Sequence, residues 1–296
     1  MEKTGGPVAF AFMLLGNSVL ALGPWLVRLA DTGPVATGAW RLILALPFLY
    51  FVSRGMGQTP HWPRRTLLLM IAGAALFYAL DLAAWNAAIL RTKLGNSTLF
   101  GNTGSIVFAV YGLIIASRAP SPRQLIALSL ALAGGALLMS GSYQLSARHF
   151  FGDLLALVAG LFYGGYLILV ERVRSKLQPL PLLLIATLFA IPPLLLISAA
   201  MGEKIWPDDW TPLLIFALSS QVLGQGMLVY SIGVFPPLVV GLALLTQPVV
   251  SAFVGWVVFN ETLTVMDVVG AVAIAAGLVL VRLPERGLRR RAPEPS

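Results

Sequence analysis

The chain consists almost entirely of long apolar runs separated by short polar connections. Each run is about 20 residues long, which is the length an α-helix needs to cross the ~30 Å hydrocarbon core of a bilayer at a rise of ~1.5 Å per residue. The connections leave no room for an extramembrane domain. The pattern therefore predicts an all-α integral membrane protein with ten transmembrane helices, over residues 7–28, 34–53, 66–89, 95–116, 122–140, 151–171, 179–200, 210–232, 236–259 and 264–282.

The ten predicted spans fall into two halves that overlay at a constant shift of 143 positions. At this shift Leu99, Thr103, Val107, Ala109, Gly112, Ala133, Gly134 and Leu137 coincide with Leu242, Thr246, Val250, Ala252, Gly255, Ala276, Gly277 and Leu280. Five spans is an odd number, so the second half enters the membrane from the opposite side, as in the inverted repeats of secondary transporters. The alternative is a duplication with no mechanistic consequence. We predict two inverted five-helix repeats, 1–145 and 146–284, and a basic tail, 285–296.

The composition agrees with a membrane protein, and the distribution of charged residues predicts how the chain is oriented in the membrane. With 58% hydrophobic and 11% charged residues and a mean hydropathy of +0.86, the chain lacks the polar surface of a water-soluble protein. If the N-terminus is cytoplasmic, 14 of the 20 basic residues lie in cytoplasmic segments and five in outer loops. This bias follows the positive-inside rule and predicts that both termini are cytoplasmic. The net charge of +8 thus reports topology, and no nucleic-acid partner is expected.

The sequence contains few residues of the types that catalysis requires. It contains no cysteine, and its two histidines, His61 and His149, lie in predicted connections. Intramembrane chemistry needs paired carboxylates, a metal cluster or an activated nucleophile. We therefore expect no enzyme, no catalytic residues, no metal site and no cofactor. An intramembrane enzyme remains the alternative from a different class.

Arg41 and Asp81 are the ionisable residues that lie well inside predicted spans. Polar groups in hydrocarbon are costly, so they mark sites of structural or functional importance. Each lies about two helical turns below the predicted outer boundary, so an ion pair is expected. Such a pair could fix helix packing, anchor a zwitterionic solute, or provide a carboxylate for proton coupling.

Aromatic, amide and hydroxyl side chains recur on the predicted spans. Tyr78, Asp81 and Trp85 stand at i, i+3 and i+7, which places them on one helix face. Each polar group alone could bridge two helices, whereas together they indicate a pocket for a neutral or zwitterionic solute, with aromatic rings available for stacking. The remaining candidate substrate-binding residues are Asn17, Asn102, Thr103, Tyr163, Tyr166, Gln221, Gln225, Thr246 and Gln247.

The segment Phe259-Asn260-Glu261-Thr262-Leu263-Thr264, followed by Gly270 and Gly277, resembles the EamA-type exporters of the drug/metabolite transporter (DMT) superfamily. Within that superfamily the chain is most similar to the YddG-type aromatic amino-acid exporters. The resemblance implies a central cavity lined by both repeats, a multi-pass protein of the bacterial inner membrane, and export of aromatic and other neutral amino acids or related metabolites by alternating access. The first half departs from the motif, with Arg118-Ala119-Pro120-Ser121 at the equivalent place.

Two other transport functions stay open. Proton-coupled efflux of drugs or other metabolites would use Asp81 as its membrane carboxylate. An exchanger of phosphorylated or nucleotide-linked sugars would need more basic residues than Arg41 alone. In every case the expected partners are a small-molecule substrate and the lipid bilayer.

Overall fold

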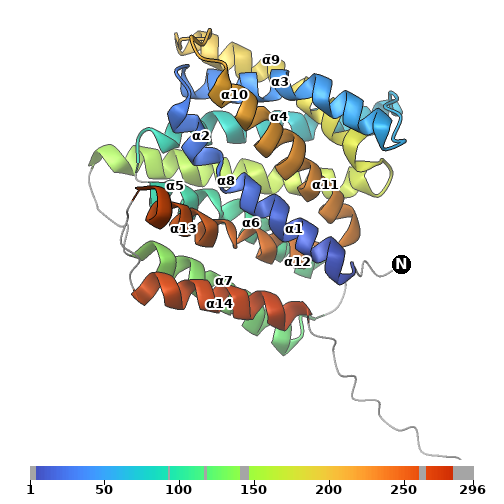
Figure 1. The fold of residues 1–296 in the computed structure, drawn as a ribbon. Helices are drawn as coiled ribbons and strands as arrows, with labels where there is room; N and C mark the ends of the chain where they lie inside the picture. The colour runs from blue at the N-terminus through green and yellow to red at the C-terminus, as the bar shows by residue number, and fades with distance from the viewer. Residues whose placement is uncertain (1–4, 93, 117–118, 141–146, 260–264, 283–296) are drawn as a thin grey trace, which may run out of the picture.

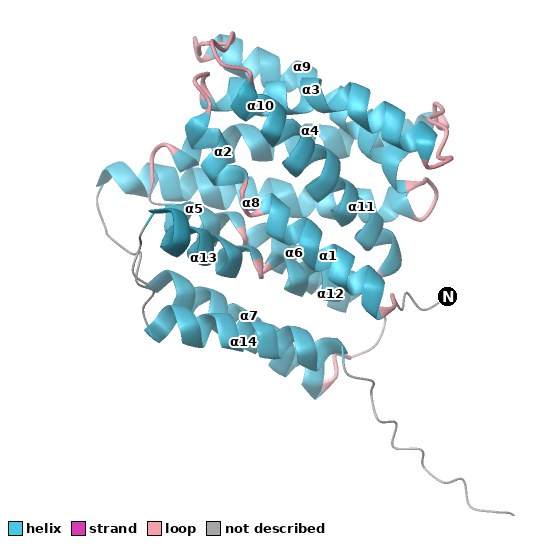
Figure 2. Cartoon of the chain, viewed as in Figure 1, coloured by secondary structure: helices cyan, strands magenta, loops and turns pink. Residues whose placement is uncertain are grey.

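The computed structural model describes residues 5–92, 94–116, 119–140, 147–259 and 265–282, and the regular secondary structure of these residues is entirely helical (Figure 2). Six helical segments among them are long and apolar enough to cross a membrane: Pro7–Leu29, Pro34–Gly55, Arg65–Ile89, Phe150–Arg174, Pro179–Ala200 and Thr211–Val234. Shorter apolar helices cover Thr103–Ile115, Pro122–Leu137, Pro237–Ser251 and Val268–Val281. The described residues therefore have the structure of a multi-pass helical membrane protein.

The helices form one bundle with their axes running roughly side by side (Figure 1). The first half contains α1 (Pro7–Leu20), α2 (Gly23–Leu29), α3 (Pro34–Gly55), α4 (Arg65–Ile89), α5 (Leu94–Gly101), α6 (Thr103–Ile115) and α7 (Pro122–Ser140). The second half contains α8 (Ala147–Arg174), α9 (Pro179–Ala200), α10 (Thr211–Phe216), the π-helix η1 (Ala217–Gly224), α11 (Gln225–Val234), α12 (Pro237–Leu244), α13 (Gln247–Phe259) and α14 (Val265–Arg282).

Several predicted spans are interrupted part-way. The first divides into α1 and α2, because Pro24 near the start of α2 cannot donate a ladder hydrogen bond and its ring clashes with the preceding turn. The fourth divides into α5 and α6, and the ninth into α12 and α13. The eighth passes through η1 without a break. Pro47 and Pro192, in contrast, lie inside continuous helices.

α3 and α9 pack against each other at one edge of the bundle (Figure 1), and each caps the other. At the start of α3, the backbone N–H groups of Val35 and Ala36 donate to the carboxylate of Glu203, at 3.3 and 2.8 Å. At the start of α9, the N–H of Leu180 donates to Oε1 of Gln58, at 3.1 Å. Because Glu203 follows α9 and Gln58 follows α3, the two helices run antiparallel.

These two caps are reciprocal. Positions 35 and 180, and positions 58 and 203, both differ by 145. The prediction of a constant shift of 143 is therefore wrong for α3 and α9, which have two more residues between them. The turns that follow the helices match as well, since Gly57 and Gly202 have φ angles of 71° and 64°, in the left-handed region that favours glycine at the end of a helix. Reciprocal contacts of this kind place a two-fold axis between the two helices.

α7 and α14 form a second reciprocal pair, at the opposite edge of the bundle (Figure 1). A Cβ atom on Gly134 would lie 2.6 Å from the carbonyl oxygen of Gly270, and one on Gly277 would lie 2.7 Å from that of Ala127. The members of these contacts are related by the shift of 143. Gly134, in the second half of α7, contacts Gly270 near the start of α14, whereas Gly277, in the second half of α14, contacts Ala127 in the first half of α7. This pair of helices is therefore also antiparallel.

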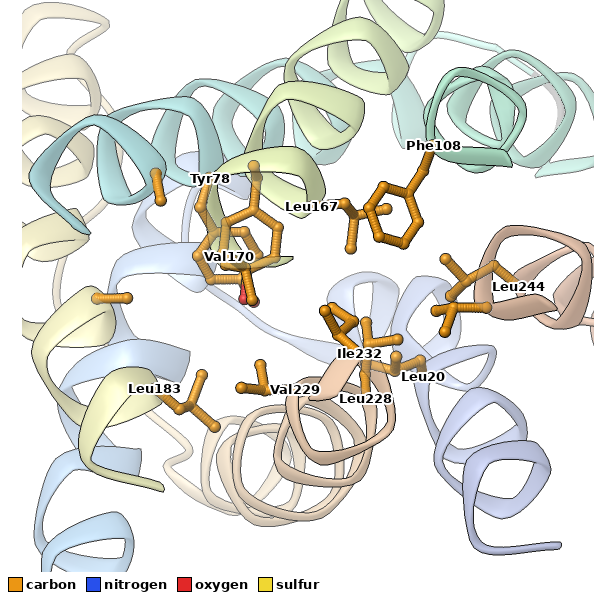
Figure 3. Packing of buried hydrophobic residues seen from close by; sticks show 14 of the residues in the cluster. Leu20, Tyr78, Phe108, Leu167, Val170, Leu183, Leu228, Val229, Ile232 and Leu244 are labelled. Atoms are coloured by element: carbon orange, nitrogen blue, oxygen red, sulfur yellow. The ribbon is translucent and has the colours of Figure 1, made fainter. Parts of the chain in front are cut away.

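Apolar side chains cover the outside of the bundle, and polar side chains are buried among the apolar ones of its interior. Asn17 and Gln221 are 0% exposed, whereas Val8, Ile114 and Leu196 are 82%, 74% and 71% exposed. Figure 3 shows apolar side chains of α4, α8, α9 and α11 converging in the core. This distribution suits a lipid environment, where the exposed apolar groups meet hydrocarbon.

Candidate functional site

A cavity of about 80 Å³ lies between helices of both halves of the chain. Its wall is formed mainly by α1, α2, α3, α4, α5 and α6 from the first half, and by α8, η1, α11 and α13 from the second. The lining residues are Leu20, Gly23, Arg41, Tyr78, Asp81, Leu82, Trp85, Thr98, Gly101, Asn102, Ser105, Tyr163, Ser220, Gln225 and Gln247.

Close helix packing brings these side chains together. A Cβ on Gly104 of α6 would lie 2.4 Å from the carbonyl oxygen of Gly160 on α8, so only glycine allows the two backbones to approach this closely. On α5, a Cβ on Gly101 would lie 3.0 Å from the indole nitrogen of Trp85. The small residues thus let α5, α6 and α8 close around the Trp85 side of the cavity.

A buried hydrogen-bond network crosses the bundle beside the cavity. Nη2 of Arg41 donates to the hydroxyl oxygen of Tyr78 at 2.8 Å, and that hydroxyl donates to Oε1 of Gln221 at 2.8 Å. Nε2 of Gln221 then donates to Oγ1 of Thr187 at 2.9 Å. The network therefore joins α3, α4, η1 and α9 through side chains that are each 3% exposed or less.

The predicted ion pair between Arg41 and Asp81 is not formed in this conformation. Both residues line the cavity, but the guanidinium of Arg41 is held by Tyr78 and lies over the ring of Phe216, 4.8 Å from its centroid. The Nε of Arg41 has no hydrogen-bond partner. The tyrosine hydroxyl and the aromatic ring thus take the place that sequence reasoning assigned to the carboxylate.

Three tyrosines form a stack beside the network. The rings of Tyr78 and Tyr166 are 4.7 Å apart, and those of Tyr163 and Tyr166 are 5.9 Å apart. The hydroxyl of Tyr166 is buried without a hydrogen-bond partner. Tyr78 and Tyr163 line the cavity, whereas Tyr166 supports them from behind.

Of the thirteen residues that the sequence singled out, the structure gathers eight at the cavity: Arg41, Tyr78, Asp81, Trp85, Asn102, Tyr163, Gln225 and Gln247. The other five lie elsewhere. Gln221 and Tyr166 support the wall from the network and the stack, and the hydroxyl of Thr246 donates to the carbonyl of Ala243. Thr103 does not line the cavity, and both side-chain polar atoms of Asn17 are buried without a partner.

Sequence reasoning missed three polar lining residues, Thr98, Ser105 and Ser220. Thr98 and Ser105 stand four positions before and three positions after Asn102, so helical spacing from that asparagine could have found them. Ser220 directly precedes Gln221 in η1, where the π-helical geometry changes which residues share a face. The apolar and glycine lining residues carried no chemical signal.

The described residues contain no group of three or more His, Asp or Glu side chains that could hold a metal ion. Charged side chains contact one another in the connections between helices. The ammonium of Lys204 contacts the carboxylates of Asp31 at 3.1 Å and Asp208 at 2.6 Å. The backbone N–H of Asp208 donates to Asp31 and, with Lys204, lowers the pKa of the Asp31 carboxyl.

The fold and the cavity define a multi-pass helical membrane protein with a small cavity between its halves. Residues 150–283 match the family described as the EamA-like transporter family. This range nearly coincides with the second predicted repeat, 146–284. The second half of the chain is therefore similar to that transporter family.

Two relatives and a solved structure are similar to the chain over most of its length. One uncharacterized transporter of Archaeoglobus fulgidus is 24% identical over 86% of this chain and 89% of its own length. A second from the same organism is 26% identical over 79% of this chain and 81% of its own length. A protein of known crystal structure matches with a TM-score of 0.73 at 13% identity, over 92% of this chain and 95% of the other. At that identity the structural match shows a shared fold alone.

Proposed function

We propose that the chain is a secondary transporter of the EamA-like family that exports neutral and zwitterionic amino acids, aromatic ones in particular, across a bacterial inner membrane. It works by alternating access, with ten spans in two inverted repeats, 1–145 and 146–284, and both termini in the cytoplasm. The reciprocal, antiparallel pairs α3–α9 and α7–α14 support this plan, because a two-fold axis across the helices relates halves of opposite orientation.

One observation carries the substrate class: the cavity holds a cation and a carboxylate that are not paired with each other. Arg41 is 3% exposed and Asp81 is 9% exposed, and both line the cavity. A buried cation without a counter-ion is costly, most of all at membrane depth. The carboxylate of an amino acid would neutralise Arg41, and its ammonium group would neutralise Asp81.

The remaining lining residues fit the rest of such a substrate. Trp85, Tyr78 and Tyr163 offer aromatic faces for stacking. Asn102, Gln225 and other neutral polar groups add hydrogen bonds without charge. The cavity of about 80 Å³ has room for no more than a few water molecules at ~30 Å³ each. Substrate binding therefore requires the helices to separate, which suits a conformation between the two open states.

The experiment uses proteoliposomes that contain the purified chain and labelled phenylalanine, tryptophan or threonine. We expect saturable flux of phenylalanine, and much lower flux of phenethylamine, which lacks the carboxylate, and of 3-phenylpropionate, which lacks the ammonium group. Flux of all three amino acids no greater than in protein-free vesicles would reject amino-acid export.

Arg41→Gln tests the proposed carboxylate site directly. The variant should reduce phenylalanine flux at least 10-fold, because the neutral amide cannot balance the substrate carboxylate. Arg28→Gln, at an exposed arginine outside the cavity, is the matched control and should retain flux. Equal flux through both variants would contradict the role of Arg41.

A second candidate is proton-coupled efflux through Asp81, which is the buried carboxylate of the cavity. Under this alternative, an imposed pH gradient drives accumulation, and Asp81→Asn abolishes the gradient dependence while leaving downhill exchange. If pH-driven accumulation persists in Asp81→Asn, coupling through this carboxylate is ruled out.

A further inference from the structure

The helix that follows α9 contains an unusual segment. Residues Ala217–Gly224 form the π-helix η1, which continues directly into α11. α4 and α11 end at Ile89 and Val234, which differ by 145 positions, the same shift as the α3–α9 caps, so these eight residues correspond to residues 72–79, inside the continuous α-helix α4. The same position in the two halves therefore has two different helical forms.

These two segments meet each other beside the cavity. Tyr78, in 72–79, and Gln221, in η1, are joined by the hydrogen bond of 2.8 Å. The two segments also border the cavity, since Tyr78 belongs to one and Ser220 belongs to the other.

Other repeat-related elements have matching forms. α5 and α12 cover 94–101 and 237–244, which are the same eight positions in the two halves. The α3–α9 and α7–α14 contacts are reciprocal. α1 and α2 are separated where α8 is continuous, but Pro24 accounts for that break, and its counterpart in α8 is Leu167. The difference between η1 and α4 has no such cause in a proline.

A π-helix is rare and usually short, so tertiary contacts must hold η1 in this form. Conversion to an α-helix would move the residues beyond it by one position, about 1.5 Å along the axis and about 100° around it. Gln225 stands at this point. It is 3% exposed, it lines the cavity, and its Oε1 has no hydrogen-bond partner.

We propose that transport exchanges the two forms: 217–224 is π-helical and 72–79 α-helical in one state, and the reverse holds in the other. The hydrogen bond between Tyr78 and Gln221 joins the two segments. Each conversion turns the residues beyond it, Gln225 in one half and Trp85 in the other, relative to the cavity. The exchange rests on the proposed alternating-access function, but it does not depend on which solute is carried.

The first test imposes the α-helical form on one segment and the π-helical form on the other by deleting or inserting one residue. Deletion of Leu223, which is 50% exposed, removes the extra residue of η1. Insertion of one alanine after Leu76, also 50% exposed, adds one to α4. The combined variant should adopt the mirror state. The natural chain has no cysteine, so Ser105→Cys at the cavity serves as a clean reporter.

In oriented vesicles, a membrane-impermeant thiol reagent should label Ser105→Cys from opposite sides in the parent and the combined variant, with a rate ratio that inverts at least 10-fold. Labelling from the same side with unchanged rates in a folded combined variant overturns the proposal.

A second measurement uses chains of natural length, in case the length variants do not fold. Spin labels at Leu214 and Tyr230 report the length of α10–α11, and labels at Leu69 and Leu90 report that of α4. These positions are exposed. We expect two distances in each pair, with populations that change in opposite directions when a pH or solute gradient is imposed.

Labels at Leu188 and Leu196 on α9 are the matched control, and their distance should stay single because α3 and α9 cap each other in both states. A single, invariant distance in the α4 and α10–α11 pairs overturns the exchange, whatever the transport assay shows. Two distances without amino-acid flux would retain the exchange and reject the proposed substrate.

Discussion

Tyr78→Phe tests the buried network at its central hydroxyl. The substitution removes the group that accepts from Arg41 and donates to Gln221, both at 2.8 Å. It keeps the ring, and therefore the stack on Tyr166 at 4.7 Å. Two buried polar atoms then lose a partner, one of them on a charged group.

The expected cost follows from these two bonds. A hydrogen bond to a charged group contributes about 1.5–3 kcal/mol, whereas a neutral interhelical bond in a membrane protein contributes about 0.6 kcal/mol on average. Arg41 and Tyr78 line the cavity, where water can replace part of the lost bond. We therefore expect Tyr78→Phe to lower the free energy of unfolding by about 2 kcal/mol.

Tyr166→Phe is the matched control. Its hydroxyl is buried without a hydrogen-bond partner, so the same chemical change removes a polar group that gains nothing from folding. The variant should be neutral or slightly more stable, because an unsatisfied buried hydroxyl costs free energy. The two variants differ only in whether the hydroxyl has partners.

The assay is equilibrium unfolding in mixed micelles with increasing denaturing detergent, followed by the fluorescence of the native tryptophans. The midpoint of Tyr78→Phe should fall well below that of Tyr166→Phe. If Tyr166→Phe costs as much stability as Tyr78→Phe, the assignment of the network as a stabilising element is refuted.

Three further predictions concern the ends and edges of the bundle. Gly134→Val should destabilise the α7–α14 contact by about 1–3 kcal/mol through overpacking, whereas Gly135→Val, where an added Cβ meets nothing within 4 Å, should preserve a similar thermal midpoint. Glu203→Ala should cost about 1–2 kcal/mol by removing the cap of α3, and Glu203→Gln should cost less, since an amide at Gln58 already caps α9. The lowered pKa of Asp31 means that its carboxylate stabilises the fold above its ordinary pKa of 3.8 and loses this effect as the pH falls below that value; the thermal midpoints of Asp31→Asn and the natural chain should differ at neutral pH and converge in acid.

The apolar runs predicted the helices well, because a membrane span is specified by length and composition within one segment. Every predicted range contains helical residues among those that the structure describes. Local rules also explain the break at Pro24, since a proline acts on its own preceding turn. The π-helical form of Ala217–Gly224 had no local signal, because no residue in it favours that geometry over an α-helix.

The candidate site was predictable in its chemistry and less so in its contacts. Buried polar residues in a membrane segment are informative wherever they occur, so Arg41, Asp81 and Tyr78 were found from the sequence. The contacts between them were not predictable, because Tyr78 and Asp81 lie within one helical turn of each other and Arg41 could reach either. The choice of Tyr78 depends on where α3 and α4 meet η1.

The sequence by itself determined that this chain consists of apolar helices and that polar groups lie within them. These properties depend on the free energy of placing each segment in lipid or water, which is nearly a sum over its residues. Tertiary structure alone decided the reciprocal caps of α3 and α9, the unpaired state of Arg41 and Asp81, and the small cavity between them. Those features arise from distances between residues more than 30 positions apart, which no local pattern encodes.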